Sequence, residues 1–474
     1  MPSTVPMSGF LLEKKPQLKK LLEKLGQTFT YVSILGTDVG SKRYNVSSRV
    51  TGISDGTWGE RGFVARVFEG GRYFEYAFNE LSGGEAAVEA VAEHITAAFN
   101  KAGGDDAYRY PTPEEIQLSQ SFQDTVEILP GALDPGAIIE KLTAMNRKVR
   151  DCSPLVVEAQ LSLGYAHVSK IFLSAKKDLE QSYVWSEAYI IAITRRDDVT
   201  RTSYKPFSGA KGLEILSEMD DRIEHVVGTA CKLLDAKPIP PGEYDIICSP
   251  DAAGIIAHEA FGHGVELDMF VRNRANAQQY IGKPVASQVV RMHDGAQAAR
   301  QVSSYLFDDE GNPGGDTVII DNGILRAGIS DALSAARLGL APTGNGKRQA
   351  YSHKAYSRMT NTFFEPGSDK LPDMIASVKH GYLIEEAESG MEDPKDWGIQ
   401  AVFTYAEEIV DGKVTGNLVA PVVMTGYVPD VLKAITMVSD DFYLSGSGAC
   451  GKGHKELAKV SCGGPYIKTR ARLG

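Results

Sequence analysis

Two histidines and a glutamate stand close together in the run AAGIIAHEAFGHGVELDMF, as His258, Glu259 and His263. Neutral imidazole is the commonest protein ligand for zinc, and a catalytic zinc takes three protein ligands and keeps one position open. A carboxylate beside a ligand can reach a metal-bound water and take its proton. The pattern therefore predicts a metal site with His258 and His263 as ligands and Glu259 as the catalytic base.

The spacing of the two histidines differs from that of the familiar zinc-protease helix, where they are four residues and about 40° apart. Here they are five residues apart, which is about 140° on a regular helix. Gly262 and Gly264 flank His263, and glycine tolerates strained backbone. We therefore expect the helix to loosen or end there and to swing His263 back. The alternative is that His258 is an ordinary hydrogen-bonded helix histidine and His263 a C-terminal cap.

A zinc site with two histidines needs a third protein ligand. Cys450 lies in the glycine-dense run LSGSGACGKGHKEL, where the backbone can approach a partner closely, and a thiolate is a strong zinc ligand. The alternative is that Cys450 is a small buried hydrophobic residue. The other candidates are Glu266, Asp268, His293, His353, His380, His454 and Cys462.

The run around Cys450 also resembles the first part of a phosphate-binding loop. Gly453 stands where a serine or threonine should hold magnesium, and too few residues follow Lys452 for the rest of a nucleotide domain. The run TGNGKR at residues 343–348 fails the same spacing test. We therefore expect no nucleotide site.

Composition and charge exclude several classes of protein. A net charge of −11 without a long basic stripe argues against nucleic acid as a partner. The N-terminus lacks an apolar signal core, and no stretch approaches 18 apolar residues, so we expect no membrane span. Five scattered cysteines, an odd number, are typical of reduced thiols in a cytoplasmic protein.

The first half of the chain predicts helices packed on an antiparallel sheet. Helical patterns cover residues 11–26, 84–101, 134–150 and 211–235. Strand-like runs are FTYVSI, YNVSSRVTGI, GFVARVF, RYFEYAF, VVEAQLSLGY, HVSKIFLSA, SYVWSEAYIIAIT and VTRTSYKPF. Residues 104–135 are polar and punctuated by prolines, which indicates a linker.

The clearest boundary is the run PIPPG at residues 238–242. After it, YDIICS predicts a short buried strand that leads into the His258 helix, and Asn-Gly and Asp-Gly turns join later apolar runs. We therefore predict an α+β protein. An N-terminal region covers residues 1–237, with possible sub-regions 1–105 and 134–237, and a strand-rich C-terminal domain with the metal site covers 238–474.

Five ordered blocks of the chain resemble the TldD/PmbA (TldE) metallopeptidase family. They are GERGFVARVFEGGRYFEYAF, GEYDIICSPDAAGIIAHEAFGHGVELD, FDDEGNPGGDTVIIDNGIL with TGNGKR, RMTNTFFEPGSD, and CGKG. The resemblance is to the TldD-like half, because this chain keeps the HExxxH motif. One departure is the run GHKE after Cys450, where the family tends to have an acidic residue and glutamine.

The resemblance implies a zinc peptidase whose ligands are His258, His263 and Cys450, with Glu259 as the catalytic carboxylate. It also implies two domains, hydrolysis of small or unfolded peptides, and a dimer with a TldE-like subunit or with a second copy. Arg358, Thr360 and Asn361, polar residues of the RMTN block, are candidates for the substrate groove, or else hold their own loop together. The alternative function is a non-catalytic subunit that binds a peptide or a partner and uses zinc structurally.

Overall fold

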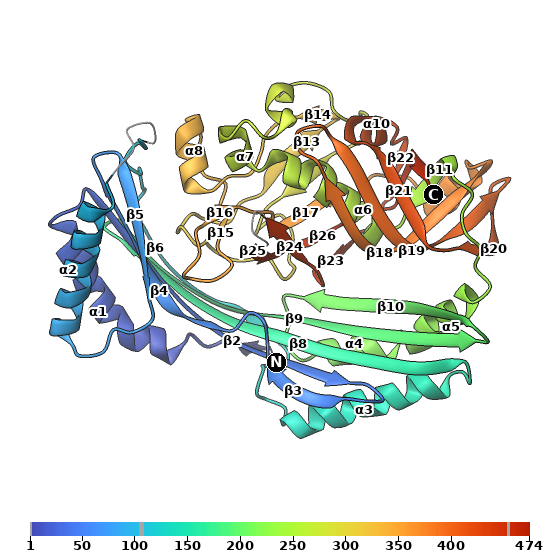
Figure 1. Ribbon diagram of the computed structural model, residues 1–474, viewed down its shortest axis with the longest axis horizontal. Helices are drawn as coiled ribbons and strands as arrows, with labels where there is room; N and C mark the ends of the chain where they lie inside the picture. The colour runs from blue at the N-terminus through green and yellow to red at the C-terminus, as the bar shows by residue number, and fades with distance from the viewer. Residues whose placement is uncertain (1, 104–108, 453–455) are drawn as a thin grey trace.

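A computed structural model describes residues 2–103, 109–452 and 456–474 of the protein. The fold is α+β, as predicted. The N-terminal half is built on one long, curved sheet in the order β10-β9-β8-β2-β4-β5, with β3 paired to β2 and β6 to β9 (Figure 1). Its strands are β2 (Tyr31–Val46), β3 (Thr51–Asp55), β4 (Glu60–Glu69), β5 (Arg72–Phe78), β6 (Leu118–Gln123), β8 (Val156–Ser174), β9 (Lys177–Arg196) and β10 (Val199–Gly209). A separate two-stranded pair joins β1 (Ser3–Thr4) to β7 (Thr125–Val126).

Helices cover the face of this sheet that lies away from the C-terminal half (Figure 1). Apolar side chains of α1 and α2 pack with β2 and β4 at one end, and those of α3, α4 and α5 pack with β8 and β9 at the other. The helices are α1 (Gly9–Gly26), α2 (Glu85–Lys101), α3 (Pro135–Asp151), α4 (Ile215–Asp220) and α5 (Ile223–Leu233). The single helix expected over 211–235 is therefore two helices. Gly104 and the start of the expected linker at 104–108 lie outside the described residues.

Several strands are longer than their sequence patterns indicate. The runs VVEAQLSLGY and HVSKIFLSA form the one strand β8, and β2 continues from FTYVSI into the next expected strand. Polar and small residues such as Ser33, Thr37, Ser41 and Ser169 are buried inside these strands, so no break in hydropathy corresponds to a break in structure. Because β2 pairs with β8, the possible sub-regions 1–105 and 134–237 share one sheet.

The C-terminal half contains a closed barrel and a second sheet. The barrel order is β11-β18-β19-β21-β27, and β27 pairs back to β11. Its strands are β11 (Gly242–Cys248), β18 (His380–Glu392), β19 (Gly398–Val410), β21 (Val422–Tyr427) and β27 (Ile467–Leu473), with β20 (Lys413–Val419) and β22 (Met437–Val438) attached. The second sheet runs β14-β13-β12-β17-β26-β23. Its strands are β12 (Met292–Asp294), β13 (Thr317–Asp321), β14 (Ile324–Leu325), β17 (Asn361–Phe364), β23 (Tyr443–Ser445) and β26 (Ser461–Gly464).

Shorter elements complete this half. Two strand pairs are β15 (Gly346–Lys347) with β16 (Tyr356–Ser357), and β24 (Ala449–Lys452) with β25 (Glu456–Lys459). The helices are α6 (Pro250–Ala257), α7 (Leu267–Val271), α8 (Ala332–Leu338), α9 (Leu371–Ala376) and α10 (Val428–Lys433), with a 3₁₀ turn at Asn276–Tyr280. No helix among the described residues is long and apolar enough to cross a membrane.

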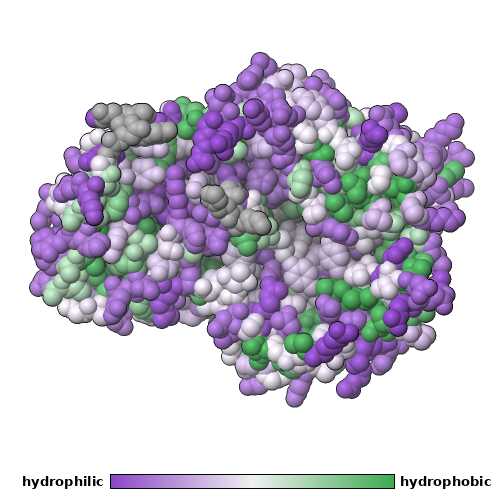
Figure 2. Space-filling view, in the orientation of Figure 1, coloured by the Kyte–Doolittle hydropathy of each residue, from purple (hydrophilic) through white to green (hydrophobic). Residues whose placement is uncertain are grey.

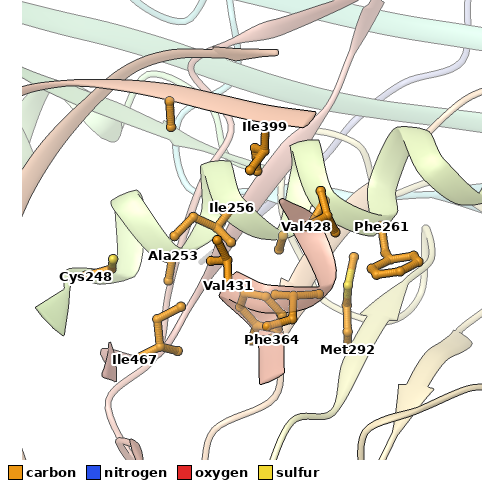
Figure 3. Packing of buried hydrophobic residues seen from close by; sticks show 14 of the residues in the cluster. Cys248, Ala253, Ile256, Phe261, Met292, Phe364, Ile399, Val428, Val431 and Ile467 are labelled. Carbon is orange, nitrogen blue, oxygen red and sulfur yellow. The ribbon is translucent and has the colours of Figure 1, made fainter. Parts of the chain in front are cut away.

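Helix α6 lies in the largest core cluster, between the barrel and the second sheet. Figure 3 shows Ala253 and Ile256 of this helix packed among Val428, Val431 and Ile467. The helix also passes close to β26, because a Cβ added at Gly254 would stand 2.5 Å from the Gly463 nitrogen. The small, apolar run AAGIIA is therefore what allows the metal motif to follow a deeply buried helix.

The two halves meet through the FDDEG loop. Gln181 of β9 donates to the Phe307 carbonyl at 2.8 Å, and Gly311 lies against the Phe172 ring with a φ of +73°. A Cβ at Gly311 would stand 2.3 Å from that ring, so a side chain has no room there. Figure 2 shows hydrophilic and hydrophobic residues mixed over this face of the molecule. The division at residues 237 and 238 stays a prediction.

Candidate metal centre

The chain leaves the regular helix α6 through a wider turn that carries both histidines. Residues His258–Gly262 form a π-helical turn, in which the His263 N–H donates to the His258 carbonyl five residues back. Phe261, with φ −123° and ψ 18°, departs from helical geometry, whereas Gly262 keeps right-handed angles. The ring centroids of the two histidines are 5.1 Å apart. The predicted return of His263 therefore occurs, but the distortion is at Phe261.

Gly262 matters because it has no side chain, and not because its backbone adopts unusual angles. A Cβ at this position would stand 2.1 Å from the Met359 sulfur, which packs directly onto the turn. The wide turn and its packing thus depend on a glycine, although for a different reason than the one inferred from the sequence. π-helical turns inside helices occur frequently at functional sites, because the wider turn presents side chains that a regular helix separates.

Cys450 comes to the histidines from β24, which pairs with β25 so that Cys450 lies opposite Ala458. The Cys450 Sγ is 3.2 Å from His263 Nε2. Ligand atoms of His258, His263 and Cys450 all lie within 4.8 Å of one another, and no other such group of three occurs among the described residues. The structure therefore brings the three predicted ligands together. Of the other candidates, His454 lies outside the described residues, and Glu266, Asp268, His293, His353, His380 and Cys462 are not in the group.

The donor set fits Zn²⁺. Two imidazoles and one thiolate are three of the ligand types that zinc prefers, and they leave one coordination position open. His258 Nδ1 is buried and has no hydrogen-bond partner among the described residues. Burial opposes ionisation of the Cys450 thiol, but His258 and His263 beside it hold its pKa well below the ordinary value. The group therefore presents a soft anion and unsatisfied nitrogen in one buried place.

Glu259 is buried next to this group. Its Oε1 is 4.0 Å from His258 Nε2. Burial raises the pKa of the Glu259 carboxyl, with His258 and His263 acting in the opposite direction. On its other side, a Cβ at Gly390 would stand 2.5 Å from Glu259 Cγ, so that glycine provides the room for the glutamate. The predicted base is thus held at the metal centre by β18.

A cavity of about 1190 Å³ opens onto the metal centre. One wall comes from β9 and β10 of the N-terminal half, including Tyr189 and Tyr204, and another from residues 387–392 of β18. The tyrosine hydroxyls hold both neighbouring walls, since Tyr189 donates to the Ser447 carbonyl and Tyr204 to the Ala387 carbonyl. The site therefore depends on both halves of the chain.

The three candidates for the substrate groove are placed differently from the prediction. Arg358, Thr360 and Asn361 are buried and do not line the cavity. Thr360 donates to Asp294 at 2.9 Å, and Asn361 donates to the Gly295 carbonyl at 3.0 Å. Both partners lie 66 residues earlier in the chain, so these contacts hold the RMTN block against residues 294–295 and are not bonds within its own loop. Substrate contact by these residues stays a prediction.

Two further residues at the site carry little signal in the sequence. Lys452, two positions after Cys450, contacts Glu266 at 3.0 Å, although the sequence suggested only a failed phosphate loop. Glu392 lines the cavity, and both its carboxylate oxygens are buried without a hydrogen-bond partner among the described residues. Burial raises the pKa of Glu392 to about 9. The position of Lys452, two residues after a candidate ligand, could have indicated a residue at the site. No feature of the sequence indicates Glu392.

Comparisons with known proteins identify the family of the chain. Residues 241–471 match the family model for the PmbA/TldA metallopeptidase C-terminal domain, which places the chain in the class of metallopeptidases. A metalloprotease TldD homolog of Buchnera aphidicola subsp. Acyrthosiphon pisum is 32% identical over 68% of this chain and 69% of its own length. A zinc metalloprotease TldD homolog of Saccharolobus solfataricus is 30% identical over 60% of this chain and 63% of its own.

The chain therefore belongs to the TldD/PmbA family, which confirms the resemblance seen in the sequence. It spans between about half and about two thirds of the length of the curated relatives that it matches. The crystal structure of TldE from Thermococcus kodakarensis shares the fold, with a TM-score of 0.74 and 18% identity over 97% of this chain and 100% of that one.

Proposed function

We propose that the chain is the catalytic subunit of a zinc peptidase that hydrolyses small or unfolded peptides. The observation that carries this proposal is the placement of a buried carboxylate, Glu259, beside three zinc-type ligands at the wall of an open cavity. A purely structural zinc site is normally closed by a fourth protein ligand and needs no base beside it. When bound by His258, His263 and Cys450, Zn²⁺ would act as a Lewis acid on a carbonyl oxygen and lower the pKa of water.

Residues of the chain itself transfer the proton and position the group that carries it. Glu259 takes a proton from the attacking water onto its carboxylate and gives it to the amine nitrogen of the leaving peptide. Its buried position excludes bulk water, which strengthens each electrostatic interaction there. Gly390 and His258 hold the carboxylate from two sides.

The cavity wall formed by β18 supports an extended peptide as the substrate. Residues 381–384 of this strand pair with β11, but residues 387–392 pair only with β19 among the described strands. The Ala387 N–H and carbonyl already bind Asp251 and Tyr204, so residues 388–392 are the part of this second edge that offers backbone groups beside the metal centre. A peptide that adds to such an edge is held by main-chain hydrogen bonds with little side-chain preference.

We infer a dimer, with a TldE-like subunit or with a second copy, and a cytoplasmic location that keeps all five cysteines free.

The variant Glu259→Gln tests this function. It keeps the shape of the side chain and removes the proton acceptor, so we expect it to fold, to retain zinc and to bind peptide. Cleavage should fall by about 10²–10⁴-fold, the usual contribution of a general acid–base group. The assay uses the complete assembly with any TldE-like subunit, and unfolded peptides as substrates.

Glu243→Gln is the matched control, because Glu243 is an exposed glutamate whose one ion pair within the described part of the chain is with Arg470. It should cleave at the wild-type rate. A Glu259→Gln assembly that also cleaves at the wild-type rate would show that Glu259 is not the base. Retained zinc and peptide binding, without cleavage by the wild-type assembly, would favour the non-catalytic subunit with a structural zinc.

A further inference from the structure

A buried glutamate contacts the face of His263 that points away from Cys450. His263 Nδ1 is 3.1 Å from Glu266 Oε2, and Glu266 is only 1% exposed. Lys452 binds the same carboxylate oxygen at 3.0 Å and Asp268 at 2.7 Å. Glu266 is therefore fixed by a cation that lies two residues from the thiol ligand.

Arg358 extends this contact to both strands of the β24–β25 hairpin. Its Nη2 donates to the Cys450 carbonyl at 2.6 Å, and its Nη1 donates to the Glu456 carbonyl at 3.0 Å. Its Nε lies 3.8 Å from Glu266 Oε1. One planar guanidinium thus contacts the backbone that carries Cys450 and the carboxylate that contacts His263, which a flexible lysine ammonium would not reproduce.

We propose that Glu266 is a positioning residue for the metal centre, held in place by Lys452 and Arg358. By accepting the Nδ1 proton of His263, it fixes the tautomer in which Nε2 is free and faces Cys450. Lys452 and Arg358 connect that carboxylate to the β24–β25 hairpin. The segment that carries His263 and the segment that carries Cys450 are therefore held in a fixed position relative to each other. The inference rests on the proposed metal site and assigns residues beyond its three ligands and its base.

The physical reason is that a carboxylate behind a ligand histidine orients the ring and makes it more basic. Loss of such a partner typically weakens metal binding by about 10–100-fold. Lys452 at 3.0 Å and Arg358 at 3.8 Å place positive charge beside this buried carboxylate. A neutral amide at this position would keep the shape and lose the charge.

The test measures zinc affinity by chelator competition on full-length protein that has been stripped of metal and then reloaded. Glu266→Gln should bind zinc about 10–100-fold more weakly than the wild type. Asp316→Asn is the matched control, because Asp316 makes the same kind of contact, at 2.8 Å, with Nδ1 of the remote His293. It should leave zinc affinity unchanged. Cobalt substitution gives a second readout, since the thiolate-to-metal absorption band reports the placement of Cys450.

A double-mutant cycle shows whether Lys452 affects zinc binding through Glu266 or independently of it. Lys452→Met alone should weaken zinc binding, but it should add little in the Glu266→Gln background, since its contact with His263 runs through the carboxylate. Fully additive losses would overturn that coupling. Wild-type zinc affinity in Glu266→Gln would overturn the positioning role itself.

If Glu266→Gln does not fold, Arg358→Lys carries the test. It keeps a cation but loses the forked contact with the Cys450 and Glu456 carbonyls, so we expect weaker zinc binding and an altered cobalt–thiolate band. Unchanged values for both would contradict the inference. A wild-type chain that binds no zinc would instead refute the proposed function, so the two failures are distinguishable.

Discussion

The metal centre and the junction between the two halves are both buried and both charged, but their charges balance differently. At the junction, three cations face three carboxylates in what we call the junction cluster: Arg66, Lys170, Arg348, Glu75, Asp309 and Glu310. At the metal centre, a thiol with a lowered pKa, the Glu259 carboxylate and an unpartnered imidazole nitrogen lie together. In the junction cluster each carboxylate has a cation as its partner, whereas at the metal centre His258 Nδ1 has no partner among the described residues.

The comparison shows what a family block alone does not reveal. FDDEG and HEAFGH both lie in blocks that resemble the family, yet Glu310 of the first binds Arg66 at 2.6 Å, at the contact between the halves. Burial opposes the charge on Arg66, but Glu310 and Glu75 outweigh it and hold its pKa well above the ordinary value. Substitutions in the junction cluster, whose charges pair with one another, should change stability. Substitutions at the metal centre should change ligand binding.

Removal of the ligands should give the largest effect. The wild-type chain should hold about one zinc, and the combined His258→Ala and His263→Ala variant should hold almost none, because one thiolate alone does not make a zinc site. Zinc should raise the unfolding temperature of the wild type but not of the variant, since only a ligand that binds the folded state stabilises it. Elemental analysis and thermal unfolding check both.

The third ligand has its own matched pair. Cys450→Ala should lose most of the zinc, whereas Cys462→Ala, a cysteine that also lines the cavity, should keep it. Full zinc in the double-histidine variant would end the assignment of the site. Equal zinc in the two cysteine variants would remove Cys450 from it.

The junction cluster should give the opposite result: a loss of stability without a loss of metal. Arg66→Met leaves Glu310 without its cation, and breaking a buried ion pair in this way typically costs about 3–5 kcal/mol. Arg61→Met, which removes an exposed arginine paired with Asp38 at 2.9 Å, should cost less than about 1 kcal/mol. Urea unfolding of both variants measures the costs. Loss of zinc from folded Arg66→Met would show that the two regions are not independent.

Much of the fold could be predicted because local patterns and tertiary structure agree. The helices over 9–26 and 135–151, capped by Ser8 and Asp134, and the Asn322-Gly323 hairpin follow capping and turn chemistry that nearby residues determine. The unbroken strand β8 could not be found, because buried serines on a long sheet have the same polarity as a loop. Their burial is decided by the strands and helices that cover them.

The candidate site divides in the same way. His258, Glu259, His263 and Cys450 could be named from residue chemistry and resemblance, and the structure brings them together. The turn at Phe261 could not be located, because it depends on Met359, about a hundred residues away, packing against Gly262. Arg358 was a candidate for the groove or for holding its own loop, and its partners on the β24–β25 hairpin become visible only in three dimensions.

The smallest expected effect concerns Glu60, the carboxylate at the junction that breaks its charge balance. Glu60 accepts a hydrogen bond from the Tyr351 N–H at 2.7 Å, and makes no ion pair within the described residues. Burial raises its pKa to about 7 from the ordinary value of 4.5, with Lys170 opposing the shift. Between these two values the folded state holds the proton more tightly than the unfolded state, so stability falls as pH rises.

Glu60→Gln removes this dependence, because an amide does not titrate. Its stability relative to the wild type should therefore increase between about pH 4.5 and 7, by about 3 kcal/mol at most. Glu69→Gln should behave oppositely. The Thr30 hydroxyl and backbone lower the pKa of Glu69, so its contribution in the wild type is present above pH 4.5 and lost as pH falls. Urea unfolding from below pH 4.5 up to about pH 7 gives both curves, with the Glu69 change expected below pH 4.5 and the Glu60 change above it. Parallel curves for Glu60→Gln and wild type would mean that Glu60 is ionised in the folded protein, and that the junction holds an unbalanced charge.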